Sequence, residues 1–175
     1  ESIKFFICVH KSLKDLVEKQ INGAYPDASI KVVPEYNIFS EKGQTAYAMY
    51  KLKNQDFFPI KTFRDLPTDP MSALTSALAK MEPEEGAAVQ LIVQPADNKW
   101  KDFGKKWLKK EKDPGKPEFP KPPPDAKQLE AVEGKISRNG FNVTLRAVVS
   151  STSKDNAKAH LSNIKASFEQ FAGPY

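Results

Sequence analysis

The chain has 175 residues, of which 39% are hydrophobic and 28% charged, and its 27 basic and 22 acidic side chains give a formal net charge of +5. This balance is typical of a soluble globular protein and excludes a membrane-spanning class, because no stretch approaches the run of about 18 apolar residues that a membrane helix needs. The single cysteine, Cys8, excludes an internal disulfide and indicates a small core residue in a reducing compartment.

The first 96 residues carry the strand and helix signals of an α+β domain. Apolar residues recur at every second position in the expected strands and at helical spacing in the expected helices. The elements, in order, are a strand at 3–9, a helix at 12–24, strands at 28–33 and 44–52, a helix at 70–81 and a strand at 86–95. The β-α-β-β-α-β order predicts a ferredoxin-like unit over residues 1–96.

The rest of the chain predicts an appended, partial unit. The dipeptide Asn139-Gly140 is the strongest short signal for a β-hairpin, so we expect a strand on each side of it. The expected segments are a basic amphipathic helix at 97–112, a proline-rich linker at 113–126, and a hairpin-plus-helix unit at 127–175 with strands at 129–137 and 141–150 and a helix from Ser153. Together they predict a second, partial ferredoxin-like half of αββα order.

No catalytic or metal-binding motif occurs in the sequence, which lacks a glycine-rich phosphate loop and histidines or cysteines at zinc-binding spacing. His10 and His160 are far apart in sequence, and we expect each to be structural or at the surface. Glu82, Glu84 and Glu85 fall in a predicted turn, where solvated carboxylates are expected. We therefore predict a protein that is not an enzyme and has no cofactor, metal or small-molecule substrate.

The helix at 97–112 is the best candidate for a contact surface. One interpretation is that its aromatic residues face the core and its lysines are simply solvated. The other is that the lysines bind an anionic membrane surface or a nucleic-acid backbone, because a basic amphipathic helix suits either. The lysines are Lys99, Lys101, Lys105, Lys106, Lys109, Lys110 and Lys112.

The ferredoxin-like plan offers a second route to nucleic acid. RNA-recognition domains with this plan stack bases on aromatic side chains of the open sheet face. Phe6 and Tyr47 are the aromatic residues expected on that face here, although the consensus sequence of those domains is absent. The alternative function is therefore a single-stranded nucleic-acid-binding module that uses the lysine helix and the open sheet face.

Several stretches resemble an uncharacterised bacterial domain. They are residues 5–21, 25–28, 58–63, 69–71, 89–95 and 140–146. The domain they resemble is found mostly in candidate-phyla bacteria, where it precedes a conjugation-type ATPase similar to the motor and coupling proteins of type IV secretion. A membrane segment often lies further upstream. The similarity extends over nearly the whole chain except about 105–127.

This resemblance implies a non-catalytic accessory domain that docks by protein–protein interaction, because the nucleotide-binding residues of such proteins lie in the downstream ATPase. The implied partners are that ATPase domain, membrane or envelope components, and a second copy of the chain. The chain begins at Glu1 rather than Met, which indicates a fragment. The implied location is cytoplasmic, at the inner face of the membrane, through a segment absent from this fragment.

Overall fold

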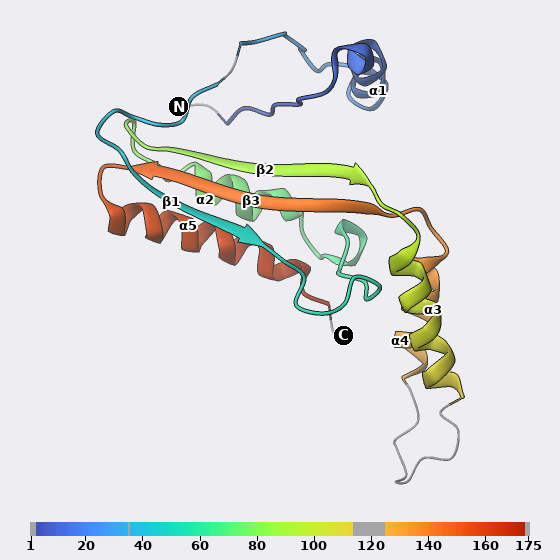
Figure 1. Cartoon of the computed structure of the whole chain (residues 1–175). Helices are drawn as coiled ribbons and strands as arrows, with labels where there is room; N and C mark the ends of the chain where they lie inside the picture. The colour runs from blue at the N-terminus through green and yellow to red at the C-terminus, as the bar shows by residue number, and fades with distance from the viewer. Residues whose placement is uncertain (1–2, 35, 114–124, 174–175) are drawn as a thin grey trace.

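The computed structural model describes residues 3–34, 36–113 and 125–173. They form a mixed α+β arrangement of helices around one antiparallel sheet (Figure 1), so the predicted α+β class is confirmed. The strands are β1 (Gln44–Tyr50), β2 (Gly86–Pro95) and β3 (Phe141–Ser151), and the helices are α1 (Lys14–Ala24), α2 (Pro70–Leu78), α3 (Lys99–Lys112), α4 (Ala126–Ile136) and α5 (Lys154–Phe168).

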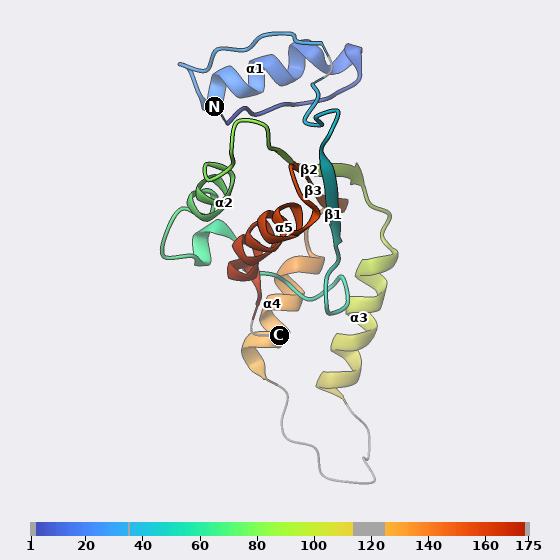
Figure 2. The same cartoon turned by 90° about the vertical axis from the view of Figure 1, so that its left-hand side faces the viewer.

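The last strand in sequence, β3, is the central strand of the sheet. The strand order is β1-β3-β2, and β3 runs antiparallel to both neighbours. β1 and β2 therefore run parallel to each other, and the chain passes between them through α2. Helices α2 and α5 both lie on one face of this sheet (Figure 2), which we call the covered face; the other is the open face.

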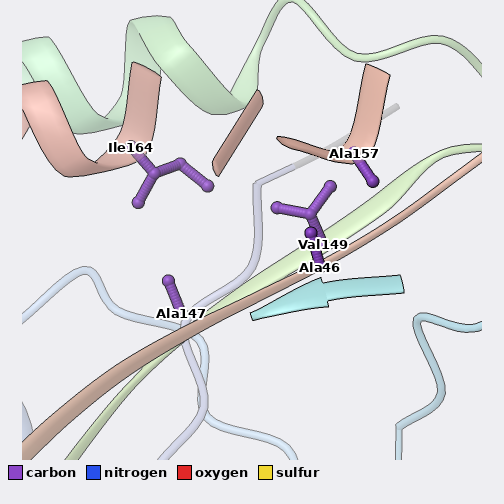
Figure 3. Packing of buried hydrophobic residues seen from close by; sticks show 5 residues of the cluster. All are labelled: Ala46, Ala147, Val149, Ala157 and Ile164. Carbon is purple, nitrogen blue, oxygen red and sulfur yellow. The ribbon is translucent and has the colours of Figure 1, made fainter. Parts of the chain in front are cut away.

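Small side chains on the covered face let α5 pack closely against the sheet. The buried side chains of this core are Ala46, Ala147 and Val149 from the strands and Ala157 and Ile164 from α5 (Figure 3). Leu74 and Leu78 of α2 extend the cluster at its side. Because burial of a side chain as large as Ile164 stabilises by about 1.5–3 kcal/mol, this layer holds α5 on the sheet, and α2 packs beside α5.

Two helices begin where the sequence offers a cap. The Asp69 carboxylate accepts the backbone N–H of Met71 at 2.9 Å, and Pro70 takes the first position of α2. The Ser153 hydroxyl accepts the N–H of Asn156 at 3.2 Å at the start of α5. Each cap satisfies an amide that has no partner inside its helix, which is worth about 1 kcal/mol.

Beyond the ends of β2 and β3, α3 and α4 lie side by side, and we call this pair the α3–α4 arm (Figure 1). Its core is separate from the core under the sheet and contains buried Phe57, Leu108 and Val132. Gly104 permits the close approach of the helices, because a Cβ at this position would lie 2.7 Å from Cγ2 of Ile136. The arm is thus a small unit with its own packing.

The strand predicted at 129–137 is wrong, because residues 129–136 lie in α4 and Ser137 is its C-cap. Apolar residues of α4 recur at helical spacing and pack against α3 and Phe57. Asp125 caps the helix by accepting the N–H of Lys127 at 2.9 Å. Since β3 pairs with β1 and β2 and not with 129–137, the predicted αββα half is wrong as well.

The strands predicted at 3–9 and 28–33 are also wrong. In the part of the chain that the structure describes, these residues belong to no strand, and they flank α1 as extended chain. The ferredoxin-like unit predicted over residues 1–96 needs both strands and is not confirmed. Most of the predicted proline-rich linker at 113–126 lies outside the described residues.

Residues 3–39, which we call the N-terminal segment, carry many large apolar side chains at the surface. None of the described residues in this segment is buried. Phe5 is 77% exposed and Val32 is 79% exposed. The full set of exposed large apolar residues is Ile3, Phe5, Phe6, Ile7, Val9, Leu13, Leu16, Tyr25, Ile30, Val32, Val33, Tyr36 and Phe39. This segment lies beside β2 (Figure 1).

Among the helices of residues 3–34, 36–113 and 125–173, none has the length and apolar character that crossing a bilayer requires.

Candidate functional site on the open sheet face

The open face of the sheet presents Tyr47 and Arg146 at its centre. Strand alternation places Ala46 and Val149 on the covered face, so their neighbours Tyr47 and Arg146 lie on the open face. Tyr47 is 80% exposed, and Arg146 is also exposed. In the register Arg146 stands opposite Met49 on one side and Gln90 on the other, which places Tyr47 diagonally across from it.

A chain of contacts joins this face to the N-terminal segment. Nε of Arg146 donates to Oε1 of Gln90, and Nε2 of Gln90 donates to the hydroxyl of Tyr36 at 3.0 Å. The ring of Tyr36 stacks on that of Phe6, with centroids 4.5 Å apart and planes inclined by 18°. Arg146 is therefore held in place by a neighbour whose own amide is fixed.

The two aromatic residues predicted for this face have different positions. Tyr47 lies on the open face of β1, as predicted. Phe6 lies in extended chain of the N-terminal segment and reaches the border of the face only through its stacking on Tyr36. Sequence reasoning missed Arg146 and Gln90, because their place beside Tyr47 depends on the long-range pairing of β3.

The charge of the open face comes from one cation. The sequences of β1, β2 and β3 contain a single charged residue, Arg146, and no carboxylate. The side chains that accompany it on this face, such as those of Gln90 and Thr144, are neutral. A polyanion approaching the sheet would therefore meet attraction at Arg146 and no opposing charge from the strands.

The helix predicted at 97–112 is confirmed as α3. Two of its three aromatic side chains pack in the arm core, and most of its lysines are exposed. Trp100 and Trp107 pack in the arm core, while Phe103 stays 62% exposed. Some lysines have partners: Lys99 lies 3.7 Å from Asp97, Lys105 lies 3.6 Å from Asp102, Lys112 contacts Glu133, and Lys101 lies over the ring of Trp100. Lys106, Lys109 and Lys110 are exposed.

Figure 2 shows where this helix stands relative to the sheet. α2 and α5 lie on one side of the strands, and α3 lies on the other, the side of the open face. Within 99–112 there are seven lysines against Asp102 and Glu111. The backbone of α3 therefore lies beyond the end of the sheet (Figure 1), on the side of the open face in this view.

A buried polar cluster lies at the opposite end of the sheet. The Glu85 side chain is only 2% exposed and accepts the N–H of Glu82 at 2.9 Å and a hydrogen bond from the Ser151 hydroxyl. Nε2 of His160 lies 3.0 Å from its Oε2. The sequence prediction that Glu85 is solvated is wrong, because the turn at 82–85 folds against the ends of β3 and α5.

This cluster does not have the arrangement of a nucleophilic triad. In such a triad the histidine contacts the hydroxyl and takes its proton. Here the Ser151 hydroxyl and Nε2 of His160 each contact the Glu85 carboxylate, so the histidine is not placed to take the proton of the hydroxyl. Among the residues that the structure describes, no group of three or more His, Cys, Asp or Glu side chains could hold a metal ion.

The cluster makes stability dependent on pH. Hydrogen bonds from Ser151 above all, and then from Glu82 and His160, hold the pKa of Glu85 below its ordinary value of 4.5. A carboxylate with a depressed pKa stabilises the fold above about pH 4.5, and this contribution is lost as the pH falls through the lower, folded-state pKa. We expect urea unfolding from pH 7 to pH 3 to show a steeper acid loss for the native protein than for Glu85→Gln. Equal slopes would contradict this expectation.

The fold and these surfaces are those of an α+β domain with an open sheet face and a basic helical arm. A family model described as a domain of unknown function, DUF8128, matches residues 1–174. The chain therefore belongs to the DUF8128 family. Neither a curated protein nor a solved structure matches it.

Proposed function

We propose that the chain is a non-catalytic docking domain that assembles with other proteins through its N-terminal segment. The observation that carries this proposal is the row of exposed apolar side chains in residues 3–39, among which no described residue is buried. Monomeric soluble proteins rarely leave large contiguous apolar surface in water, and such surface usually marks an interface. A partner that covers the segment would remove this surface from water.

The way the segment is attached supports a docking role. Near its C-terminal end, Tyr36 bonds to Gln90, and Gly86 lets the carbonyl of Ile38 approach so closely that a Cβ there would lie 2.4 Å from it. The ring of Phe6 stacks on that of Tyr36, and this contact links the earlier part of the segment to the sheet. The segment is thus anchored at one end and presents α1 and its flanking chain outward.

The edge of the sheet at β1 offers a second docking element. β1 has one neighbour, β3, among the described strands, and its sequence contains neither proline nor a charged residue. Edge strands without such protection readily pair with a strand of another chain. We infer that the β1-α2-β2-β3-α5 order is a ferredoxin-like sheet in which the place beside β1 is left for such a strand.

The sequence resemblance names the first partner to test. The resembling domains precede a conjugation-type ATPase, so that ATPase, envelope components of the same system and a second copy of the chain are the proposed partners. Docking to such an assembly would place the domain at the inner face of the membrane.

We expect Phe5→Asp combined with Val32→Asp to weaken binding to the conjugation-type ATPase of the same organism at least tenfold, measured by isothermal titration calorimetry. Both side chains are largely exposed, so their replacement should change the free energy of unfolding by about 0.5 kcal/mol or less.

The matched control is Asn22→Asp combined with Ser29→Asp, which adds the same two carboxylates at exposed polar positions of the segment. This control should bind as the native chain does. The docking proposal fails if the native chain binds neither the ATPase nor envelope components nor itself at micromolar concentration, or if the apolar variant binds as well as the control.

A further inference from the structure

We propose that the open face of the sheet, together with α3, binds single-stranded nucleic acid. This function is separate from docking through the N-terminal segment, since it uses Tyr47, Arg146 and the lysines of the arm. It rests on three features that the fold brings to one side of the molecule: an exposed aromatic ring, a positioned guanidinium and a basic helix.

Tyr47 supplies a stacking surface. Its ring is 80% exposed at the middle of β1, where no described side chain stacks on it. Bases stack on such rings in sequence-tolerant single-strand binding, and Met49, also exposed on the same face, extends the apolar surface.

Arg146 and Gln90 supply polar contacts at the correct place. Gln90 holds Nε of Arg146 and is itself held by the hydroxyl of Tyr36, so the guanidinium is oriented before any ligand arrives. A guanidinium fixed in this way can pair with a phosphate or stack on a base. The exposed amides that follow on the same face, Gln94 and Asn142, can bond to base edges.

Charge favours a polyanion over a neutral or acidic protein as the ligand of this face. The strands contribute one cation and no carboxylate, and the nearby helix α3 contains seven lysines against two acidic residues. Lys106, Lys109 and Lys110 are exposed. Such a distribution attracts a phosphate backbone and makes its binding depend on salt.

The dimensions suit a short single strand. The seven residues of β1 span about 23 Å, which is comparable with the shortest sites, about four nucleotides, of small single-strand-binding folds. A nucleic-acid strand that stacks on Tyr47 and passes Arg146 could continue over Asn142, against the direction of β3, toward α3. Duplex DNA would not offer its bases to Tyr47, so single strands should bind more tightly.

The test uses fluorescence anisotropy with labelled oligonucleotides of about twelve nucleotides, one of deoxythymidine and one of uridine, at about 50 mM and 200 mM salt. We expect Tyr47→Ala to weaken binding about tenfold at both salt concentrations, because stacking is lost. Arg146→Gln should weaken binding and lower the salt slope by about one. The triple variant Lys106→Glu, Lys109→Glu, Lys110→Glu should nearly abolish binding.

Matched controls separate this site from general charge. Tyr25→Ala removes an exposed tyrosine of the N-terminal segment, and should bind as the native chain does. Lys154→Glu, Lys158→Glu, Lys165→Glu makes the same charge change on α5, across the sheet, and should reduce affinity about threefold or less in physiological salt.

Each outcome decides the proposal. Binding lost in the Tyr47 and Arg146 variants and kept in the controls supports it, and the relative affinities of the two oligonucleotides then distinguish DNA from RNA. No binding at low salt overturns it. Binding that is unchanged by Tyr47→Ala and Arg146→Gln also overturns it. So does a parallel assay in which the chain binds phosphatidylserine vesicles and neither oligonucleotide. The docking variant Phe5→Asp, Val32→Asp should keep oligonucleotide binding, so failure of one proposal is distinct from failure of the other.

Discussion

Glu85→Ala should lower the free energy of unfolding by about 3 kcal/mol. The substitution leaves the Ser151 hydroxyl, which is fully buried, without the carboxylate to which it donates. It also removes the partner of Nε2 of His160, whose Nδ1 is already buried without a partner among the described residues. Breaking a buried, hydrogen-bonded charge in this way costs more than the loss of an average hydrogen bond.

The control is Glu84→Ala, which removes an exposed carboxylate from the neighbouring position in the same turn. It should change stability by about 0.5 kcal/mol or less in urea unfolding followed by far-ultraviolet circular dichroism. If the two variants unfold at the same urea concentration, the cluster contributes nothing specific and the turn is only a connection.

Gly104→Val should destabilise the α3–α4 arm by about 2 kcal/mol while leaving the sheet folded. A Cβ at this position meets Cγ2 of Ile136 at 2.7 Å and Cβ of Phe57 at 3.0 Å, so the two helices must separate. The only two tryptophans of the chain, Trp100 and Trp107, both lie in α3. Tryptophan fluorescence therefore reports on the arm, and circular dichroism reports on the whole chain.

The matched control is Gly134→Ala in α4, where an added Cβ meets nothing within 4 Å. This change should stabilise the arm by about 0.5–1 kcal/mol, because alanine is the better helix former. If Gly104→Val shifts the fluorescence and circular dichroism transitions together and by the same amount, the two cores do not unfold independently.

Local signals in the sequence predicted α1, α2, α3, α5 and the three strands that pair, but not α4. Asp69-Pro70 and Ser153 mark helix starts that the structure has at those places, since a cap depends only on residues within one turn. The strands predicted at 44–52, 86–95 and 141–150 likewise correspond to β1, β2 and β3.

Prediction failed where distant parts of the chain compete for one position. A ferredoxin-like unit over 1–96 would place residues 3–9 beside the strand at 44–50, but β3 pairs there along the whole of β1. Periodicity identifies a candidate strand and does not say which of two candidates takes the central place. For the same reason Tyr47 could be proposed as a site residue, while Arg146 and Gln90 could not.

The segment 129–137 shows a conflict between two local signals. Asn139-Gly140 predicts a hairpin, yet Asp125 and the helical spacing of Leu129, Val132 and Ile136 predict a helix. The helix forms because its apolar face meets α3, and Gly140 instead makes room for the ring of Trp100, from which a Cβ would be 2.6 Å away. Glu85 was missed because its partners, Ser151 and His160, come from the far end of the sequence.

The position of the arm has a consequence for how the domain tolerates change. The chain leaves the sheet at Pro95 and returns at Phe141, which stand opposite each other, and the N–H of Ala96 bonds to the carbonyl of Gly140 at 3.2 Å. For the sheet, everything between these points is one closed loop. Each doubling of a loop's length costs only about 0.6 kcal/mol, so the sheet should tolerate a longer or shorter segment between these two points while the strand register stays fixed.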